Sequence, residues 1–264
     1  MARTKFTIGA GPSLASLERL RAETAQARVD ALSGLAMMSL SAPEAFGAAT
    51  SATLRELAAE LPVRTQPNGD PRCVAYAFAT AMDLCALAET GVDPDLHDRF
   101  SVDDAWVQMK KKPKIPNGVA AVGAGITDEA CWPHGAAAGC PDVATRRFRA
   151  RVEQPVATNA QHLVPLLCEA LDRNVPLVTG VPIFTNFPKF KESGLFRAKG
   201  SVVGAHALVI VDYEEDAHGA GGCWVALNSW GVDWGDGGLV RIAWNDVDLR
   251  PEAALFMVSA ISEA

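Results

Sequence analysis

The sequence has few of the features that mark specialised classes of protein. Its 264 residues contain no run approaching the roughly 18 consecutive apolar residues of a membrane-spanning helix. The apolar stretch after Lys5 is broken by Thr7 and two glycines before it reaches the length of a signal-peptide core. The chain also shows no internal repeat and no low-complexity tail. We therefore expect a soluble protein in the cytoplasm, with no membrane partner.

The sequence also lacks an excess of basic residues and a paired cysteine motif. The net charge is −7, and the one basic cluster, at residues 110–114, is typical of a solvated helix end, so we expect no nucleic-acid partner. We expect no cofactor and no metal, and the oligomeric state is left open. The six cysteines include no CxxC pair, which argues against a zinc knuckle or a dithiol redox motif: Cys73, Cys85, Cys131, Cys140, Cys168 and Cys223.

The pattern that is present predicts a helical first half and a strand-rich second half. Residues 14–32, 51–60 and about 160–172 have apolar side chains at helical spacing. After the turn cluster TQPNGDP, the run CVAYAFATAMDLCALAE predicts a long, buried helix from Cys73 to Glu89. From residue 176 onward, short β-branched runs alternate with turns and predict antiparallel strands. The fold class is therefore α+β, with a groove between two lobes.

Three residues in separate runs have the properties of a thiol active site. A cysteine at a helix N-terminus lies at the positive end of the peptide dipoles, which favours its thiolate, and Cys73 is expected there. His206, at the start of GAHALVIVDY, is the best imidazole to pair with it. Asn228, in CWVALNSW, is expected to hold the imidazole if the two strands form a hairpin. Trp230 would then shield this hydrogen bond from water, and Ser229 is a second supporting residue.

A nucleophile also needs donors for the oxyanion that forms on the attacked carbonyl group. The backbone N–H of Cys73 is one candidate, and the side chain of Gln66, a short loop upstream, is the second. Other polar residues have simpler explanations. Glu214, Glu215 and Asp216 are expected to form a solvated hairpin tip.

The order of these residues resembles the papain-like cysteine peptidases, family C1. The resemblance rests on PVRTQ before the loop, CVAYAFA at Cys73, GAHALVIVDY around His206 and NSWGVDWGDGGLVRI from Asn228, and it runs from about Pro62 to the end. It implies a helical left lobe with the nucleophile helix, an antiparallel β-barrel-like right lobe, and a cleft between them. It also implies hydrolysis of peptide bonds in a peptide or protein through an acyl thioester.

The sequence departs from the family in several places. One extra residue separates Gln66 from Cys73, and Asp70 stands where the family has a second cysteine, which fits a bacterial-type intracellular member without that disulfide. The substrate-binding glycine pair is matched only by Asn117 and Gly118. We divide the chain into a helical extension at 1–60, which lacks the family's inhibitory propeptide pattern, and a catalytic domain at 61–264. Three roles for the extension stay open: a pro-segment that covers the cleft, a structural extension, or a region that recognises the substrate.

Two other functions use the same residues. An acyl transferase or peptide ligase passes the thioester to an amine instead of water. A non-catalytic peptide-binding protein keeps the fold without turnover. Analysis of the products distinguishes the first, and intact peptide with measurable binding distinguishes the second.

Overall fold

The computed structural model describes residues 52–90, 99–111, 126–129, 147–153, 160–215, 221–244 and 255–263. The helix expected over residues 14–32 lies outside these ranges. The helices are α2 (Leu54–Glu60), α3 (Cys73–Thr90), α4 (Val102–Lys111), α6 (Ala160–Asp172) and the 3-10 helix η3 (Phe187–Lys189). The strands are β1 (Arg99–Phe100), β2 (Ile126–Glu129), β3 (Arg147–Glu153), β4 (Leu177–Phe184), β5 (Leu195–Phe196), β6 (Val202–Glu215), β7 (Gly222–Leu227), β8 (Leu239–Ala243) and β9 (Leu255–Glu263).

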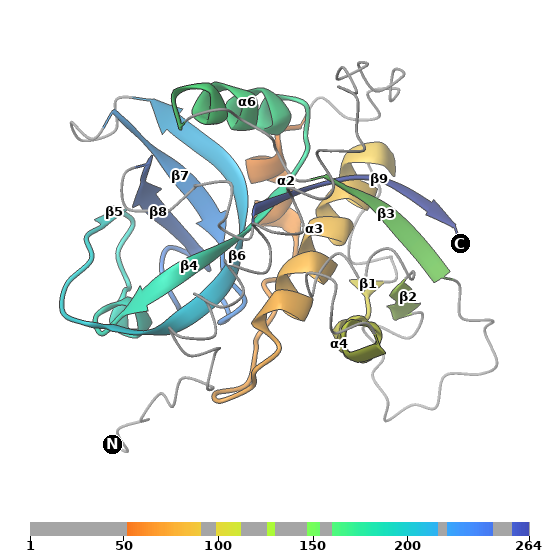
Figure 1. Ribbon diagram of the computed structural model, residues 1–264, viewed down its shortest axis with the longest axis horizontal. Coiled ribbons are helices and arrows are strands. Elements are labelled where there is room, and N and C mark those ends of the chain that lie inside the picture. Colours follow the sequence, from red (N-terminus) through yellow and green to blue (C-terminus); the bar gives the residue numbers. More distant parts are fainter. Residues whose placement is uncertain are drawn as a thin grey trace, which may run out of the picture.

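Helix α3 lies at the centre of the structure (Figure 1). On one side of it are α4, β1 and β2, which together with α3 we call the helical lobe, and on the other are β4–β8, the sheet lobe. Ala75, Phe78, Ala79 and Met82 of α3 are fully buried. Alanine favours helix and lets neighbouring elements approach closely, so α3 can be covered on several faces. The predicted long, buried helix is confirmed.

The described strands form one nine-stranded sheet with the order β1-β2-β3-β9-β4-β6-β7-β8-β5. All of its pairs are antiparallel except β5 with β8, which is parallel. Strand β9 pairs with both β3 and β4, and α3 packs against β6 and β9. The α+β class is confirmed, and the predicted antiparallel half needs only the addition of the parallel pair β5–β8.

The hairpin expected between the two runs around residues 206 and 228 is present. Strands β6 and β7 pair antiparallel, with Val209 opposite Leu227 and Ile210 opposite Ala226. Both strands are buried around these pairs. Their continuous apolar runs fit a sheet that is covered on both faces.

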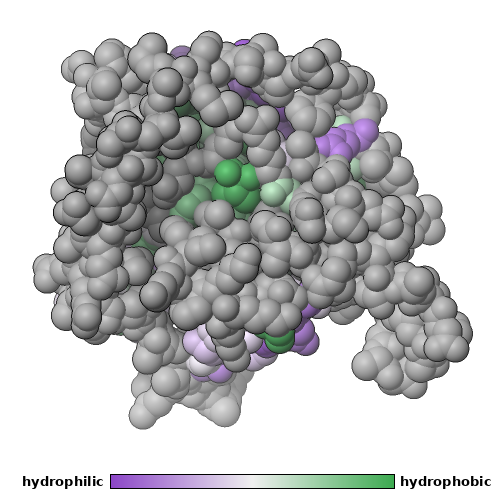
Figure 2. Space-filling view, turned by 45° about the vertical axis from the view of Figure 1, so that its right-hand side comes forward, coloured by the Kyte–Doolittle hydropathy of each residue, from purple (hydrophilic) through white to green (hydrophobic). Residues whose placement is uncertain are grey.

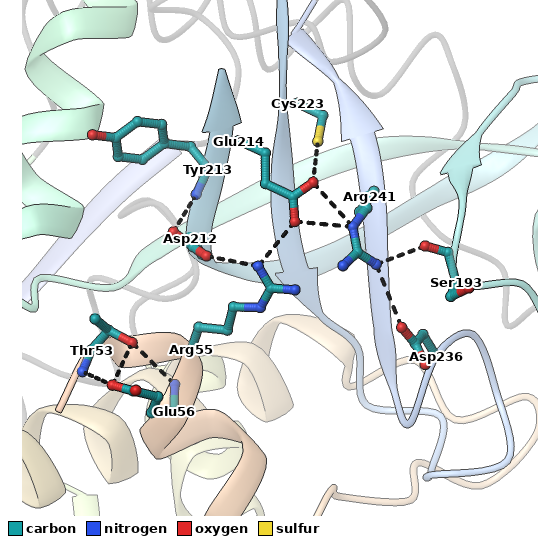
Figure 3. Close-up of polar contacts among 10 residues, drawn as sticks. All are labelled: Thr53, Arg55, Glu56, Ser193, Asp212, Tyr213, Glu214, Cys223, Asp236 and Arg241. Carbon is teal, nitrogen blue, oxygen red and sulfur yellow. Dashed lines mark hydrogen bonds and ion pairs between the residues drawn. The ribbon is translucent and has the colours of Figure 1, made fainter. Parts of the chain in front are cut away.

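Helix α2 is joined to the sheet lobe by apolar and charged contacts. Thr53 caps it in a capping box with Glu56, and Leu54, Leu57 and Ala58 are buried in the common core. Arg55 reaches β6, where it pairs with Asp212 and Glu214 (Figure 3). The helix predicted over 51–60 is thus confirmed over Leu54–Glu60.

The prediction of a solvated acidic hairpin tip is wrong for Glu214. Its carboxylate lies between the guanidinium groups of Arg55 and Arg241, with nitrogen–oxygen distances of 2.9 and 3.1 Å (Figure 3). Arg241 also donates to the carbonyl of Ser193 at 2.7 Å. Two cations from separate elements converge on this carboxylate, and that arrangement has no signature in the local sequence.

The surface of the described residues is mixed. On the face in Figure 2, they show hydrophobic groups near the centre and hydrophilic groups toward the upper right. The exposed large apolar side chains of the described residues are all valines: Val107, Val202, Val203 and Val232. Within the part of the chain that the structure describes, no helix combines the length and hydropathy that a membrane crossing requires.

Candidate active site

Cys73 is the first residue of α3 and is partly buried. Burial raises the pKa of its thiol, while hydrogen bonds from the backbone N–H groups of Ala207, Val74 and Cys73 itself act to lower it. The contact with Ala207 brings the sulfur next to the residue that follows His206. The sequence argument expected a lowered pKa from the helix N-terminus. The helix amides do favour the thiolate, but burial outweighs them in this arrangement.

His206 and Asn228 are brought together by the β6–β7 hairpin. The Nε2 atom of His206 lies 2.7 Å from Oδ1 of Asn228, and the two residues are only 6% and 3% exposed. The backbone N–H of Ser229 donates to the same atom at 2.7 Å. Because an N–H group needs an acceptor, the amide atom that faces the ring is the oxygen and not the nitrogen. An amide oxygen only accepts hydrogen bonds, so the neutral ring carries its proton on Nε2 and leaves Nδ1 as an acceptor.

The histidine is neutral at ordinary pH. Burial lowers the pKa of His206 to about 4, although the hydrogen bond to Asn228 acts in the opposite direction. A neutral imidazole with a free Nδ1 is a general base, and it is ready to accept a proton from a neighbouring thiol.

Trp230 lies against the imidazole ring. The two ring centroids are 4.6 Å apart with an interplanar angle of 34°. Edge-to-face contacts with Phe187 and Trp234, at 5.6 and 5.4 Å between centroids, fix the indole from other sides. The indole therefore limits the access of water to the His206–Asn228 hydrogen bond.

The glycines that follow Trp230 allow this segment to approach residues 63–65. Gly231 has φ +82°, and an added Cβ would lie 3.0 Å from Oγ1 of Thr65. Gly238 has φ +91°, and its Cβ would lie 2.8 Å from a methyl carbon of Val63. Positive φ and close contact both favour glycine at these two positions.

Gln66 is held by this close approach. Its backbone N–H donates to the carbonyl of Ser229 at 2.6 Å, and its Oε1 accepts from the Ser229 hydroxyl at 2.9 Å. Its Nε2 donates to the carbonyl of Asp70 at 2.6 Å. The side chain is 8% exposed, and the bonds at both of its ends fix the orientation of the amide.

Two residues that support the site were missed in the sequence. Arg64 donates to Asp83 in the middle of α3 and to the carbonyl of Phe100, each at 2.8 Å, and the side chains of Arg64 and Asp83 are 9% and 5% exposed. The other oxygen of Asp83 accepts from the N–H of Phe100 at 2.9 Å. The available signal was an acid in the middle of an apolar helix, which calls for a buried partner. The partner itself is not identifiable from sequence.

The remaining site predictions lie elsewhere. Asn117 and Gly118, suggested to bind substrate, lie outside the described residues. Within the described ranges, no group of three or more His, Cys, Asp and Glu side chains is arranged to hold a metal ion. Of the other cysteines that the structure describes, Cys85 and Cys223 are buried, whereas Cys168 is partly buried.

Comparison with known proteins places this site in a family context. A sequence model described as "Papain family cysteine protease" matches residues 118–254, a range that contains His206 and Asn228 but begins after Cys73 and Gln66. Cathepsin B-like CP3 of Giardia intestinalis is 38% identical over 79 residues, which is 30% of this chain and 26% of the relative. The chain thus spans about a quarter of that protein's length. This relative is eukaryotic, and the bacterial, intracellular type of member expected above stays a prediction.

Solved structures give the same fold. Procathepsin B S9 from Trypanosoma congolense matches with a TM-score of 0.58 at 16% identity, over 77% of this chain and 73% of that one. The bromelain protease from Ananas comosus, solved in complex with the E64 inhibitor, matches with a TM-score of 0.51 at 19% identity, over 79% and 97% of the two chains. These similarities confirm the predicted two-lobed α+β architecture.

Proposed function

Because the chain belongs to the papain family of cysteine proteases, we propose that it hydrolyses peptide bonds, with Cys73 as the nucleophile and His206 as the general base and then acid. The observation that carries the proposal is the buried pair His206 and Asn228, whose hydrogen bond places the ring proton on Nε2 and makes Nδ1 the proton acceptor. The contact between Ala207 and the Cys73 sulfur gives further support.

The first step is the attack of sulfur on the carbonyl carbon of a peptide bond. Both groups start neutral, because burial raises the pKa of Cys73 and lowers that of His206. The thiol proton therefore passes to Nδ1 as the carbon–sulfur bond forms. The resulting imidazolium is stabilised by its Nε2–H bond to Asn228, and Trp230 keeps this bond dry.

The oxyanion that forms needs hydrogen-bond donors, and we assign these to Gln66 and the backbone N–H of Cys73. One hydrogen of the Gln66 amide is engaged by the carbonyl of Asp70, and the second remains for the substrate oxygen. Collapse of the intermediate expels the amine, which takes the proton from His206, and leaves an acyl thioester on Cys73. Water activated by His206 then releases the acid and restores the thiol.

The test combines selective labelling with turnover. We expect iodoacetamide and E64 to label Cys73 in preference to Cys168, which is also partly buried and serves as the internal comparison. Replacing His206 with Ala should abolish the preference. Cys73→Ala should abolish cleavage of a peptide library, while Cys168→Ala should retain it. Equal labelling of both cysteines, or cleavage by Cys73→Ala, would overturn the proposal.

The fate of the acyl group separates hydrolysis from transfer. Product masses measured with and without an added amine are expected to show the free acid as the main product in both. A product that carries the amine would identify a transferase or ligase. Bound but intact peptide after long incubation would identify a binding protein.

We further propose that residues 61–264 form the catalytic domain and that residues 1–60 extend it. Helix α2 shares the common core, so it is expected to stabilise the domain even if it takes no part in the chemistry. The full chain can be compared with versions that begin at residues 52 and 61. We expect cleavage in all three and a lower unfolding midpoint only when α2 is removed. Higher activity in the version that begins at 52 would show that the first 51 residues inhibit the enzyme.

A further inference from the structure

The loop between Gln66 and Cys73 contains an ion pair that the sequence comparison did not predict. The side chain of Arg72 donates hydrogen bonds to the carboxylate of Asp70: from Nε to Oδ1 at 2.9 Å and from Nη2 to Oδ2 at 2.7 Å. The backbone N–H of Arg72 also donates to Oδ1, at 3.0 Å. The side chain of Asp70 is only 8% exposed, so this pair is better shielded from solvent than a surface ion pair.

The same Asp70 also holds the amide of Gln66. Its backbone carbonyl accepts from Nε2 of Gln66 at 2.6 Å, and its N–H donates to the carbonyl of Pro67 at 3.0 Å. The residue between Asp70 and Arg72 is a proline, which fixes one backbone angle of the link. A movement of Asp70 therefore shifts the Gln66 amide relative to the start of α3.

Arg72 is itself held in place on the helical lobe. Its Nη1 pairs with Asp103 in the first turn of α4, and its guanidinium carbon lies 5.8 Å from the centroid of the Tyr76 ring. The guanidinium holds the pKa of the Asp70 carboxyl below its usual range, so the pair stays charged at neutral pH. The loop is thus tied to α3 and α4 through one cation.

We propose that the Asp70–Arg72 ion pair is a positioning device for the oxyanion donor Gln66, at the position where the resemblance leads one to expect a cysteine. It keeps the carbonyl of Asp70 where it binds one amide hydrogen of Gln66, so that the second hydrogen points to the forming oxyanion. Asp70 and Arg72 are positioning residues and do not contact the reacting atoms. The inference rests on the proposed peptidase function.

The main test is Asp70→Asn, which keeps the side-chain volume and removes the charge. Complete loss of an oxyanion donor lowers kcat by about 100- to 1,000-fold, so a displaced donor is expected to lower it by about tenfold with KM nearly unchanged. Inhibition by the peptide aldehyde N-acetyl-Phe-glycinal should also weaken, because the oxygen of its hemithioacetal adduct with Cys73 takes the position of the oxyanion. The rate of Cys73 alkylation by iodoacetamide, which forms no oxyanion, should stay the same.

Matched variants separate this role from a general structural one. Glu169→Gln removes a carboxylate from an exposed ion pair with Arg173 and should change none of these quantities. In a Gln66→Ala background, Asp70→Asn should have no further effect on kcat. Arg72→Lys keeps the charge but cannot form the bidentate pair with Asp70, so it should give an intermediate loss in kcat. An unchanged kcat in Asp70→Asn, or equal losses with and without Gln66, would overturn the inference.

A measurement without turnover distinguishes this failure from failure of the proposed function. In the Cys73→Ala protein, the NMR signals of the Gln66 side-chain NH2 group are expected to shift and to exchange faster when Asp70→Asn is added. If these signals change while the wild-type protein cleaves no peptide, the positioning role of the Asp70–Arg72 pair is supported and the peptidase proposal is wrong. If the signals do not change, the Asp70–Arg72 pair does not position Gln66.

Discussion

The two sides of the candidate site are held by different forces. On the side of Cys73 and Gln66, buried or partly buried ion pairs fix the backbone: Arg64 with Asp83, and Arg72 with Asp70. On the side of His206, a neutral hydrogen bond to Asn228 lies under an aromatic ring. Charged anchors fix position through strong directional bonds, whereas the neutral side keeps the pKa of the base low.

The largest effect is expected from the buried ion pair. Asp83→Ala leaves the guanidinium of Arg64 in the interior without its carboxylate, and it also removes the partner of the Phe100 N–H. Breaking such a pair from one side costs about 3–5 kcal/mol in the free energy of unfolding. Urea unfolding would measure this loss. Arg173→Ala, in an exposed pair, is the control and should cost less than about 0.5 kcal/mol.

The neutral side should instead respond to pH. The pKa of His206 is about 4 in the folded protein, against about 6.5 for an unperturbed histidine. Between these two values His206 is protonated in the unfolded chain but not in the folded protein. Stability that is present above pH 6.5 is therefore lost as the pH falls toward 4. Over the whole interval this residue accounts for a loss of about 3 kcal/mol in the free energy of unfolding.

A comparison of unfolding at pH 7 and pH 4.5 would detect this contribution. His206→Gln should lose less stability over that interval than the wild type. Identical slopes in the two proteins would mean that the histidine is charged or exposed in the folded state.

A smaller effect is expected where the two sides touch. Gly231→Ala forces an alanine into φ +82° and brings its Cβ to 3.0 Å from the Thr65 hydroxyl oxygen. Strain of this kind costs about 1–3 kcal/mol. Gly237→Ala is the control, since it has φ +63° but open space around its Cβ, and it should be less destabilising. If thermal unfolding shows the same loss of stability in both variants, the cost of Gly231→Ala comes from its backbone conformation alone.

The smallest effect is expected from the partly exposed network on α2. Arg55→Gln removes a cation that is paired with Asp212 and Glu214, all with side chains about one third exposed. Such pairs contribute about 0.2–1 kcal/mol and are screened by salt. The difference from wild type should shrink in 1 M NaCl. The loss in Asp83→Ala, by contrast, should be nearly independent of salt, because its pair is buried.

The regular elements were well predicted from sequence because their signals are local. The breaker-free run from Cys73 gave the helix, and the β-branched runs gave the hairpin that carries His206 and Asn228. Glu214 shows where local reasoning fails. Three neighbouring acids suggest a solvated turn, but the solvation of Glu214 is decided by Arg55 and Arg241, which lie far away in the sequence.

By itself, the sequence determined the identities and the order of the chemical groups: a cysteine that opens a helix, a histidine on one strand, an asparagine directly after the neighbouring strand, and glycines that permit a close turn. Tertiary structure alone decided their protonation states and the contacts that hold them in place. Burial sets the pKa values of Cys73 and His206, and contacts between distant segments join Arg64 to Asp83. The physical reason is that desolvation and ion pairing depend on everything that surrounds a group in space, whereas a sequence pattern records only its neighbours along the chain.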